Sequence, residues 1–445
     1  MFTVPNRLAR HACGSRRRWA PALALVALVV GLDVRAQQAL TLEQALQLAQ
    51  ERSRQLVAQD RAASGAREMA IAAGQLPDPT LKAGINNLPI DGADRFSLTR
   101  DFMTMRSISV MQEFTRDEKR KARSARFDRE AEAAEAGRAA ALANLRRDTA
   151  MAWLERYYQE RTFEVLQAQR AEAALQIEAA DAAYRSGRGA QADVFAARSA
   201  VAQIDDRIQQ TDRQIATAKT KLARWVGDGA DHALGAPPPL AAVRLSGVNL
   251  EAQMERHPQF ALMLRKEAVA RAEADIAQSN KRSDWSVELM YQQRGPAYSN
   301  MVSVNLSVPL QWDQQNRQDR EVAAKLALAE QMRAEREEAV REYTAEIRTW
   351  LQEWQSNRDR LAHYDSALIP LAAERTRAAI AAYRGGAGPL ASVLEARRLE
   401  IEARVDRLGL ERETAGVWAR LEYLFPTEPQ ASMPDLPATL KEQQR

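Results

Sequence analysis

Cysteine is almost absent from this chain of 445 residues. Its one cysteine, Cys13, precedes the first apolar run, so it cannot be the first mature residue that a lipoprotein needs. No cysteine occurs after residue 36. If residues 1–36 are removed as a signal peptide, the mature protein has no thiol. This excludes disulfides, thiolate metal sites and cysteine nucleophiles.

Long apolar runs are also missing. No stretch of 18 or more apolar residues follows residue 36, which argues against transmembrane helices. Residues 1–36 resemble a secretory signal peptide, with a basic start, an apolar run over 19–32 and a small-x-small cleavage site at 34–36. A membrane anchor is the less favoured alternative, because about 14 apolar residues are too few to span a bilayer.

Aromatic residues make up only 6% of the chain and charged residues 27%, which is typical of helices with much solvated surface. The formal net charge is +4, but the predicted signal peptide carries six arginines and one aspartate. The remainder is therefore close to −1. The positive total charge is no evidence for a nucleic-acid partner.

Enzyme motifs are lacking as well. The chain contains no G-x-S-x-G, no H-E-x-x-H and no P-loop, and the three histidines after residue 36 (His232, His257 and His363) are scattered. The glycine-rich segment 385–388 fits a turn between helices better than a phosphate loop. We predict no catalytic activity and no catalytic, cofactor-binding or metal-binding residue.

Methionine is the one remaining candidate metal ligand, because thioethers suit soft ions such as Cu(I). Met103, Met105 and Met111 cluster near one predicted strand, and Met290 and Met301 fall on the polar side of another hairpin. Methionine also fills irregular apolar gaps, and this is the interpretation that we favour.

What the chain does contain is one segment twice. Residues 182–198 and 381–397 are identical at ten of seventeen positions. A spacing of about 200 residues lies far outside the 20 to 50 residues of solenoid repeats, so a whole half of the protein has been duplicated. Each copy interrupts a helical pattern at a glycine-rich turn, where an antiparallel helix begins.

The same order of elements is expected in both halves. Apolar spacing predicts an entering helix, two strands, a long helix and a returning helix. In the first half these cover about 40–74, 80–90, 104–114, 117–185 and 190–226, and in the second 249–282, 284–294, 300–310, 313–384 and 389–424.

Several local signals refine this prediction. Thr41 and Gln44 form a capping-box pattern at the first helix. The 69 residues of 117–185 would make a helix of about 105 Å, long enough for an entering and a returning helix to lie end to end beside it. Pro370 predicts a kink in the second long helix, and residues 227–248 form a non-helical belt by composition.

The predicted strands alternate between apolar and polar residues. Trp285, Val287, Leu289 and Tyr291 alternate with polar neighbours, and the strand over 300–310 repeats the pattern. Strands of about ten residues with this alternation are the length that crosses a membrane. Soluble hairpins packed on helices are an equally weighted alternative.

This arrangement resembles the TolC family of outer-membrane efflux channels over about residues 40–425. The resemblance rests on the two Tyr-Arg-x-Gly turns at 184–187 and 383–386 and on the element order behind a signal peptide. It implies two efflux repeats, 37–248 and 249–425, with a flexible tail at 426–445. Residues 74–89 and 103–114 look most like the heavy-metal type, which exports copper and silver or cobalt, zinc and cadmium.

The fold that the resemblance implies is mainly α, with a pair of membrane β-hairpins. A homotrimer would close one twelve-stranded β-barrel on a periplasmic tunnel of coiled-coil helices. The implied partners are a periplasmic adaptor and an inner-membrane RND-type pump, in addition to outer-membrane lipid. Part of this follows independently, because four strands cannot close a membrane barrel alone.

The resemblance also identifies candidate residues at the helix tips, where family members narrow the entrance and meet the adaptor. Tyr383, Asp193 and Glu395 match gating positions, whereas Gly388 and Ser392 depart from the best-known pattern. The full set of tip and gate candidates is Tyr184, Arg185, Gly187, Asp193, Tyr383, Arg384, Gly386 and Glu395. A purely structural role in packing and capping the turns is the alternative.

The function expected from these observations is passive export of heavy-metal ions through the cell outer membrane. Two alternatives remain. One is a soluble periplasmic adaptor or scaffold, which would share the long helices. The other is a channel of the same family for organic compounds.

Overall fold

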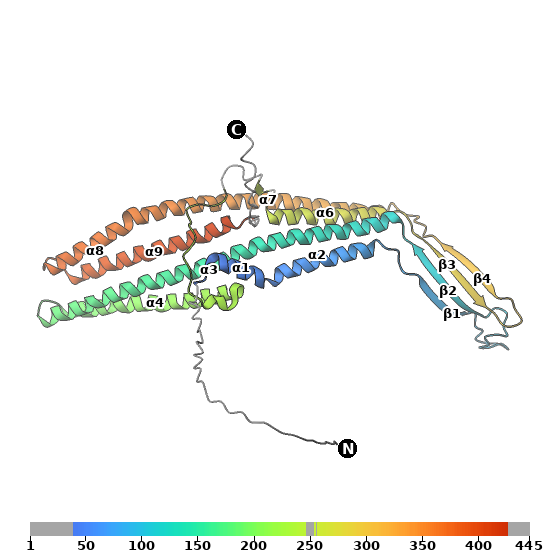
Figure 1. The fold of residues 1–445 in the computed structure, drawn as a ribbon, viewed down its shortest axis with the longest axis horizontal. Coiled ribbons are helices and arrows are strands. Elements are labelled where there is room, and N and C mark those ends of the chain that lie inside the picture. Colours follow the sequence, from blue (N-terminus) through green and yellow to red (C-terminus); the bar gives the residue numbers. More distant parts are fainter. Residues whose placement is uncertain (1–38, 246–252, 255, 426–445) are drawn as a thin grey trace, which may run out of the picture. The chain divides into compact units, whose positions relative to one another are not determined.

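The computed structural model describes residues 39–245, 253–254 and 256–425 (Figure 1). The predicted signal peptide, the helix start at Asn249 and the predicted tail at 426–445 lie outside the described residues. The rest is mostly helical, with one small antiparallel sheet. Within the described ranges, no helix is both long and apolar enough to cross a membrane.

The elements follow the predicted order in both halves. The first half contains α1 (Leu42–Arg52), α2 (Arg54–Ala73), β1 (Thr80–Asn86), β2 (Met105–Phe114), α3 (Asp117–Arg185), α4 (Gln191–Val226) and the short helix η1 (Gly227–Asp231). The second half contains α6 (Pro258–Ser279), β3 (Trp285–Gln293), β4 (Met301–Ser307), α7 (Gln318–His363), η2 (Tyr364–Leu368), α8 (Ile369–Arg384) and α9 (Leu390–Glu422).

The prediction of one entering helix over 40–74 was wrong, because the chain forms two helices that meet at Ser53. Ser53 is extended, and its hydroxyl accepts a hydrogen bond from Leu56 N, so it caps α2. The predicted capping box of α1 is confirmed: Thr41 Oγ1 accepts from Gln44 N at 3.2 Å, and Gln44 Oε1 accepts from Thr41 N at 3.0 Å.

The second long helix also differs from the prediction. It begins at Gln318 rather than near Asp313, and it changes to a π-helical turn, η2, just before Pro370. Proline has no N–H to donate and its ring crowds the preceding turn, which explains a wider turn at this place. Both long helices are followed by a returning helix, as expected.

The strand prediction was correct in position and less so in length. β2 and β3 match the prediction closely, whereas β1 ends at Asn86 and β4 at Ser307, four and three residues early. Asn87 has a positive φ of 57°, which the extended backbone of a strand cannot contain. β1 therefore ends there.

The short helices pack along the long ones as the lengths predicted. α3 contacts α2 over one part and α4 over another, and it also contacts α6 and α9 (Figure 1). The largest core cluster joins residues from both halves, including the fully buried Trp153, Leu222, Ile347 and Leu421. This core holds the two halves together.

The segment predicted to be a non-helical belt begins with the short helix η1, and tryptophan side chains hold the part after it on the core. The indole N–H groups of Trp354 and Trp418 donate to the carbonyl oxygens of Leu240 and Ala242 at 3.2 and 2.9 Å. Trp153 donates to the carbonyl oxygen of Leu40, which also accepts from Gly235 N of this segment. The guanidinium of Arg156, itself buried, donates to the carbonyl oxygens of Ala230 and His232. These bonds satisfy backbone groups that the belt does not pair within itself.

Candidate functional site

The four strands form a single sheet in the order β1-β2-β3-β4, with every neighbour antiparallel. β2 comes from the first half and β3 from the second, so their pairing joins the two hairpins. Val110 lies opposite Leu289, and Ser109 opposite Met290. The register therefore assigns each residue of the four strands to one of two faces.

One face of the sheet is apolar on all four strands. Its members include Leu81 and Ile85 of β1, Ile108 and Val110 of β2, Leu289 and Tyr291 of β3, and Val302, Val304 and Leu306 of β4. Their side chains are between 43% and 68% exposed. An apolar surface of this extent is larger than a soluble protein usually leaves uncovered.

The opposite face is polar, and on the two central strands it is the more covered of the two. On the central strands Ser109 is only 3% exposed and Glu288 is half-buried, whereas their apolar neighbours Val110 and Leu289 are 48% and 56% exposed. A soluble sheet covers its apolar face and leaves its polar face in water. Here the two faces are reversed, as in a strand with lipid on one side and water on the other.

A hydrogen-bonded group occupies the centre of the polar face. Glu288 accepts from Ser109 Oγ at 2.7 Å, and from Lys82 Nζ and Asn305 Nδ2 at 3.4 Å each. The group draws on all four strands. The sequence indicated that these residues are polar, but only the β2–β3 pairing places Ser109 next to Glu288.

The sheet meets the helices at a tight junction between the two halves. The rings of Phe114 and Trp285 stack with their centroids 4.3 Å apart. Beside them, Asp284 accepts from Arg116 N at 2.9 Å and from the buried Lys119 Nζ at 2.8 Å. Ion pairs with this little solvent exposure are costly to break on one side, so the junction holds the sheet on α3.

At the other end of the helices, the two predicted turns have the same backbone geometry. Gly187 and Gly386 both lie in the left-handed region, with φ of 71° and 72°. The matching amides after them, Arg188 N and Ala387 N, donate to carbonyl oxygens at 2.9 and 2.8 Å. Glycine is required at these positions because a side chain would strain the left-handed conformation.

The tyrosines and arginines of the two turns lie in different surroundings. Tyr184 is 45% exposed, whereas Tyr383 packs on a small apolar cluster shared by the two hairpins. This cluster consists of Ala180, Val194, Ala197, Leu390 and Val393. Arg185 pairs with Asp181 one turn earlier in α3, and Arg384 is exposed at the end of α8.

The two acidic candidates are engaged within their own helices. Asp193 accepts from Ala190 N at 3.1 Å and so caps the start of α4. Glu395 accepts from Arg398 at 2.8 Å, and this hydrogen bond holds the pKa of the carboxyl below its usual range. Both carboxylates therefore already have a hydrogen-bond partner.

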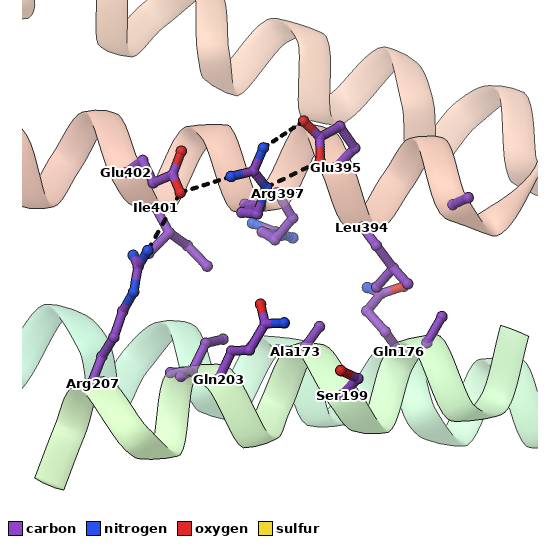
Figure 2. A pocket seen from close by; sticks show the side chains of 15 residues that line it. Ala173, Gln176, Ser199, Gln203, Arg207, Leu394, Glu395, Arg397, Ile401 and Glu402 are labelled. Atoms are coloured by element: carbon purple, nitrogen blue, oxygen red, sulfur yellow. Dashed lines mark hydrogen bonds and ion pairs between the residues drawn. The ribbon is translucent and has the colours of Figure 1, made fainter.

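A cavity of about 400 Å³ lies between the two hairpins near this end (Figure 2). Apolar side chains from α3, α4 and α9, among them Ala173, Ile204 and Leu394, line its floor. Its charged rim contains Glu395, Arg398, Glu402 and Arg207, and Arg207 bonds to Glu402 at 3.4 Å. The sequence prediction found Glu395 but missed the other three. Arg398 and Glu402 follow it in α9, whereas Arg207 comes from α4, nearly 200 positions earlier in the chain.

In the described part of the chain, no three His, Cys, Asp or Glu side chains are grouped closely enough to hold a metal ion. The candidate functional site consists of two parts, the sheet with one apolar and one polar face, and the pair of helix tips with a cavity near them.

Several solved structures share this arrangement. The chain is similar to the outer-membrane channel OprN, with a TM-score of 0.72 and 17% identity over 86% of this chain and 89% of that one. It is also similar to the outer-membrane protein VceC of Vibrio cholerae, with a TM-score of 0.69 and 18% identity over 86% and 95%. A third similar structure is that of CusC, reported with the conformational changes that accompany its folding and transmembrane channel formation. Its TM-score is 0.71, with 15% identity over 87% of this chain and 92% of that one.

The chain has the fold of these three proteins. No protein-family model matches it, and no curated protein sequence matches it. The three structures are similar to it to nearly the same degree.

Proposed function

We propose that this protein is the outer-membrane channel of a tripartite efflux system, through which substrate leaves passively and without chemistry. The observation that carries the proposal is the reversed sheet, whose apolar side chains are exposed on all four strands, whereas the polar side chains of the central strands β2 and β3 are more covered. Such a surface is stable in lipid and unfavourable in water. The fold shared with outer-membrane channels supports the same conclusion.

The proposal requires self-association. A four-stranded sheet leaves the outer edges of β1 and β4 unpaired, and unpaired strand edges are not tolerated in lipid. We propose that a homotrimer pairs these edges and closes one twelve-stranded barrel, with the polar face lining the lumen. Both halves, 37–248 and 249–425, would act as efflux repeats that contribute one hairpin each.

The helix tips are proposed as the end that meets a periplasmic adaptor and, through it, an RND-type inner-membrane pump. The cavity between the hairpins supports this, because an apolar floor with charged residues on its rim suits a partner helix. The gating candidates Tyr383, Asp193 and Glu395 remain proposals. A gate that includes Glu395 would need to release it from Arg398.

We propose heavy-metal ions such as copper or silver as the substrate. Support comes from the sequence resemblance of 74–89 and 103–114 to the heavy-metal type of efflux channel. A channel for organic compounds is the alternative within the same architecture. A soluble periplasmic adaptor or scaffold is the alternative outside it.

Fractionation and conductance together test the channel. We expect the protein in the outer-membrane fraction, released only by detergent, and we expect the detergent-purified protein to open stable conductances in planar bilayers. Recovery in the soluble periplasm without detergent would reject the channel in favour of the adaptor. A membrane protein that never conducts would reject passive export.

A further inference from the structure

All four methionines of the sheet lie on its polar face. Met105 and Met111 of β2, Met290 of β3 and Met301 of β4 share the face of Ser109 and Glu288, and the apolar face has no methionine on these strands. Methionine is expected among the apolar residues if it merely fills gaps in packing. Its neighbours here are polar, so the gap-filling interpretation that the sequence favoured does not explain this placement.

Two of these methionines flank the central hydrogen-bonded pair. Met111 lies directly opposite Glu288, and Met290 directly opposite Ser109. Side chains opposite each other on one face are about 5 Å apart, and diagonal neighbours are within reach of long side chains. The two methionines therefore lie on one diagonal of a square whose other diagonal is the 2.7 Å bond from Ser109 to Glu288. The Met290 sulfur accepts a hydrogen bond from Gln292 Nε2 at 3.0 Å, which a bound cation would replace.

A positive charge already lies beside Glu288 and Met111. Lys82 Nζ lies 3.4 Å from Glu288 Oε1 and 3.7 Å from Met111 Sδ, and the lysine side chain is 51% exposed. The place between the carboxylate and the sulfur thus accommodates a cation. Since the lysine is flexible and half in solvent, another cation can displace it at small cost.

We infer that Met111, Met290 and Glu288 form a weak transit site for a soft monovalent cation such as Cu(I) or Ag(I). Two thioethers and one carboxylate select soft ions, because hard ions such as Mg²⁺ require a full shell of oxygen ligands. Competition from Lys82 keeps the affinity low, which suits a conduit where tight binding would stop the flow. The inference rests on the proposed channel and identifies where its substrate is handled.

Silver titration of the full-length protein in detergent tests the site. Silver nitrate in chloride-free buffer is followed by calorimetry, and X-ray absorption at the silver edge detects sulfur ligands. M111L/M290L conserves side-chain volume and should weaken Ag(I) binding by at least about tenfold. The matched control M69L removes an exposed methionine on α2 and should change nothing. Unchanged affinity in M111L/M290L would overturn the site.

Two further measurements sharpen the result. K82Q removes the competing charge and should raise Ag(I) affinity several-fold, whereas a decrease would contradict the role given to Lys82. Conductance of the wild-type protein in potassium nitrate tests the channel separately. If the wild-type protein conducts but M111L/M290L keeps the wild-type Ag(I) affinity, the silver site is rejected and the channel stands. If the wild-type protein never conducts, the role of the site in transit is rejected.

Discussion

His257 shows how one residue couples the fold to pH. Its side chain is 6% exposed and lies against the rings of Phe260, Tyr343 and Phe425, while its Nδ1 accepts from Gln259 N and caps α6. Burial, with a smaller contribution from Arg147, lowers its pKa to about 4. The folded state therefore prefers the neutral imidazole.

This shift predicts a loss of stability in acid. The imidazole of His257 binds a proton near pH 6.5 in the unfolded chain and only near pH 4 in the folded chain. The free energy of unfolding therefore falls as the pH drops from about 6.5 to about 4, by up to about 3 kcal/mol. H257N keeps a capping acceptor that does not titrate, and its thermal midpoint should vary less between pH 4 and 7. The exposed His363 offers the control H363N, which should retain the wild-type pH dependence.

The two turn glycines make a second prediction for single residues. An alanine at either position meets no atom within 4 Å, so the cost of G187A or G386A is the left-handed backbone alone, about 1 to 2 kcal/mol each. G65A lies in the exposed middle of α2, where alanine is preferred, and should stabilise by up to about 1 kcal/mol. Thermal unfolding compares the three, and equal effects would contradict the argument.

The strands give a prediction that separates the channel from a soluble scaffold. Val304 is 68% exposed on the apolar face of β4, and its chain neighbour Asn305 belongs to the polar face beside Glu288. V304R should cost about 2 to 4 kcal/mol in lipid and reduce the folded protein in the outer membrane. N305R should be tolerated, because an arginine there can pair with Glu288. Equal yields of both variants would indicate that the sheet does not face lipid.

The elements that depend on neighbouring residues in the sequence could be predicted, and those that depend on residues far apart in the sequence could not. The single long helix α3 and the capping box of α1 follow from local sequence, and both were predicted. The break at Ser53 was missed, and for the π-turn before Pro370 only a kink was predicted, because several local geometries suit these sequences. The pairing of β2 with β3 joins residues about 180 positions apart, and no local pattern encodes it.

At the scale of the whole molecule, the same limit applies to the candidate site. The turns at Gly187 and Gly386 could be located because each copy carries its own glycine. The cavity between the hairpins and the square around Glu288 could not, since both combine residues from different halves. The elements could thus be predicted within each half, while the interface between the halves holds the surfaces that we propose as functional.

The last prediction concerns what the assembled protein exports. If soft cations pass the polar face, deleting the gene should lower resistance to copper or silver more than resistance to organic dyes. Complementation with M111L/M290L should restore less silver resistance than complementation with M69L, at equal amounts in the outer membrane. Growth inhibition across a silver series and a dye series measures both effects in one experiment. Sensitivity to dyes alone would reject the metal substrate and leave a channel for organic compounds, because the reversed sheet does not depend on what passes through it.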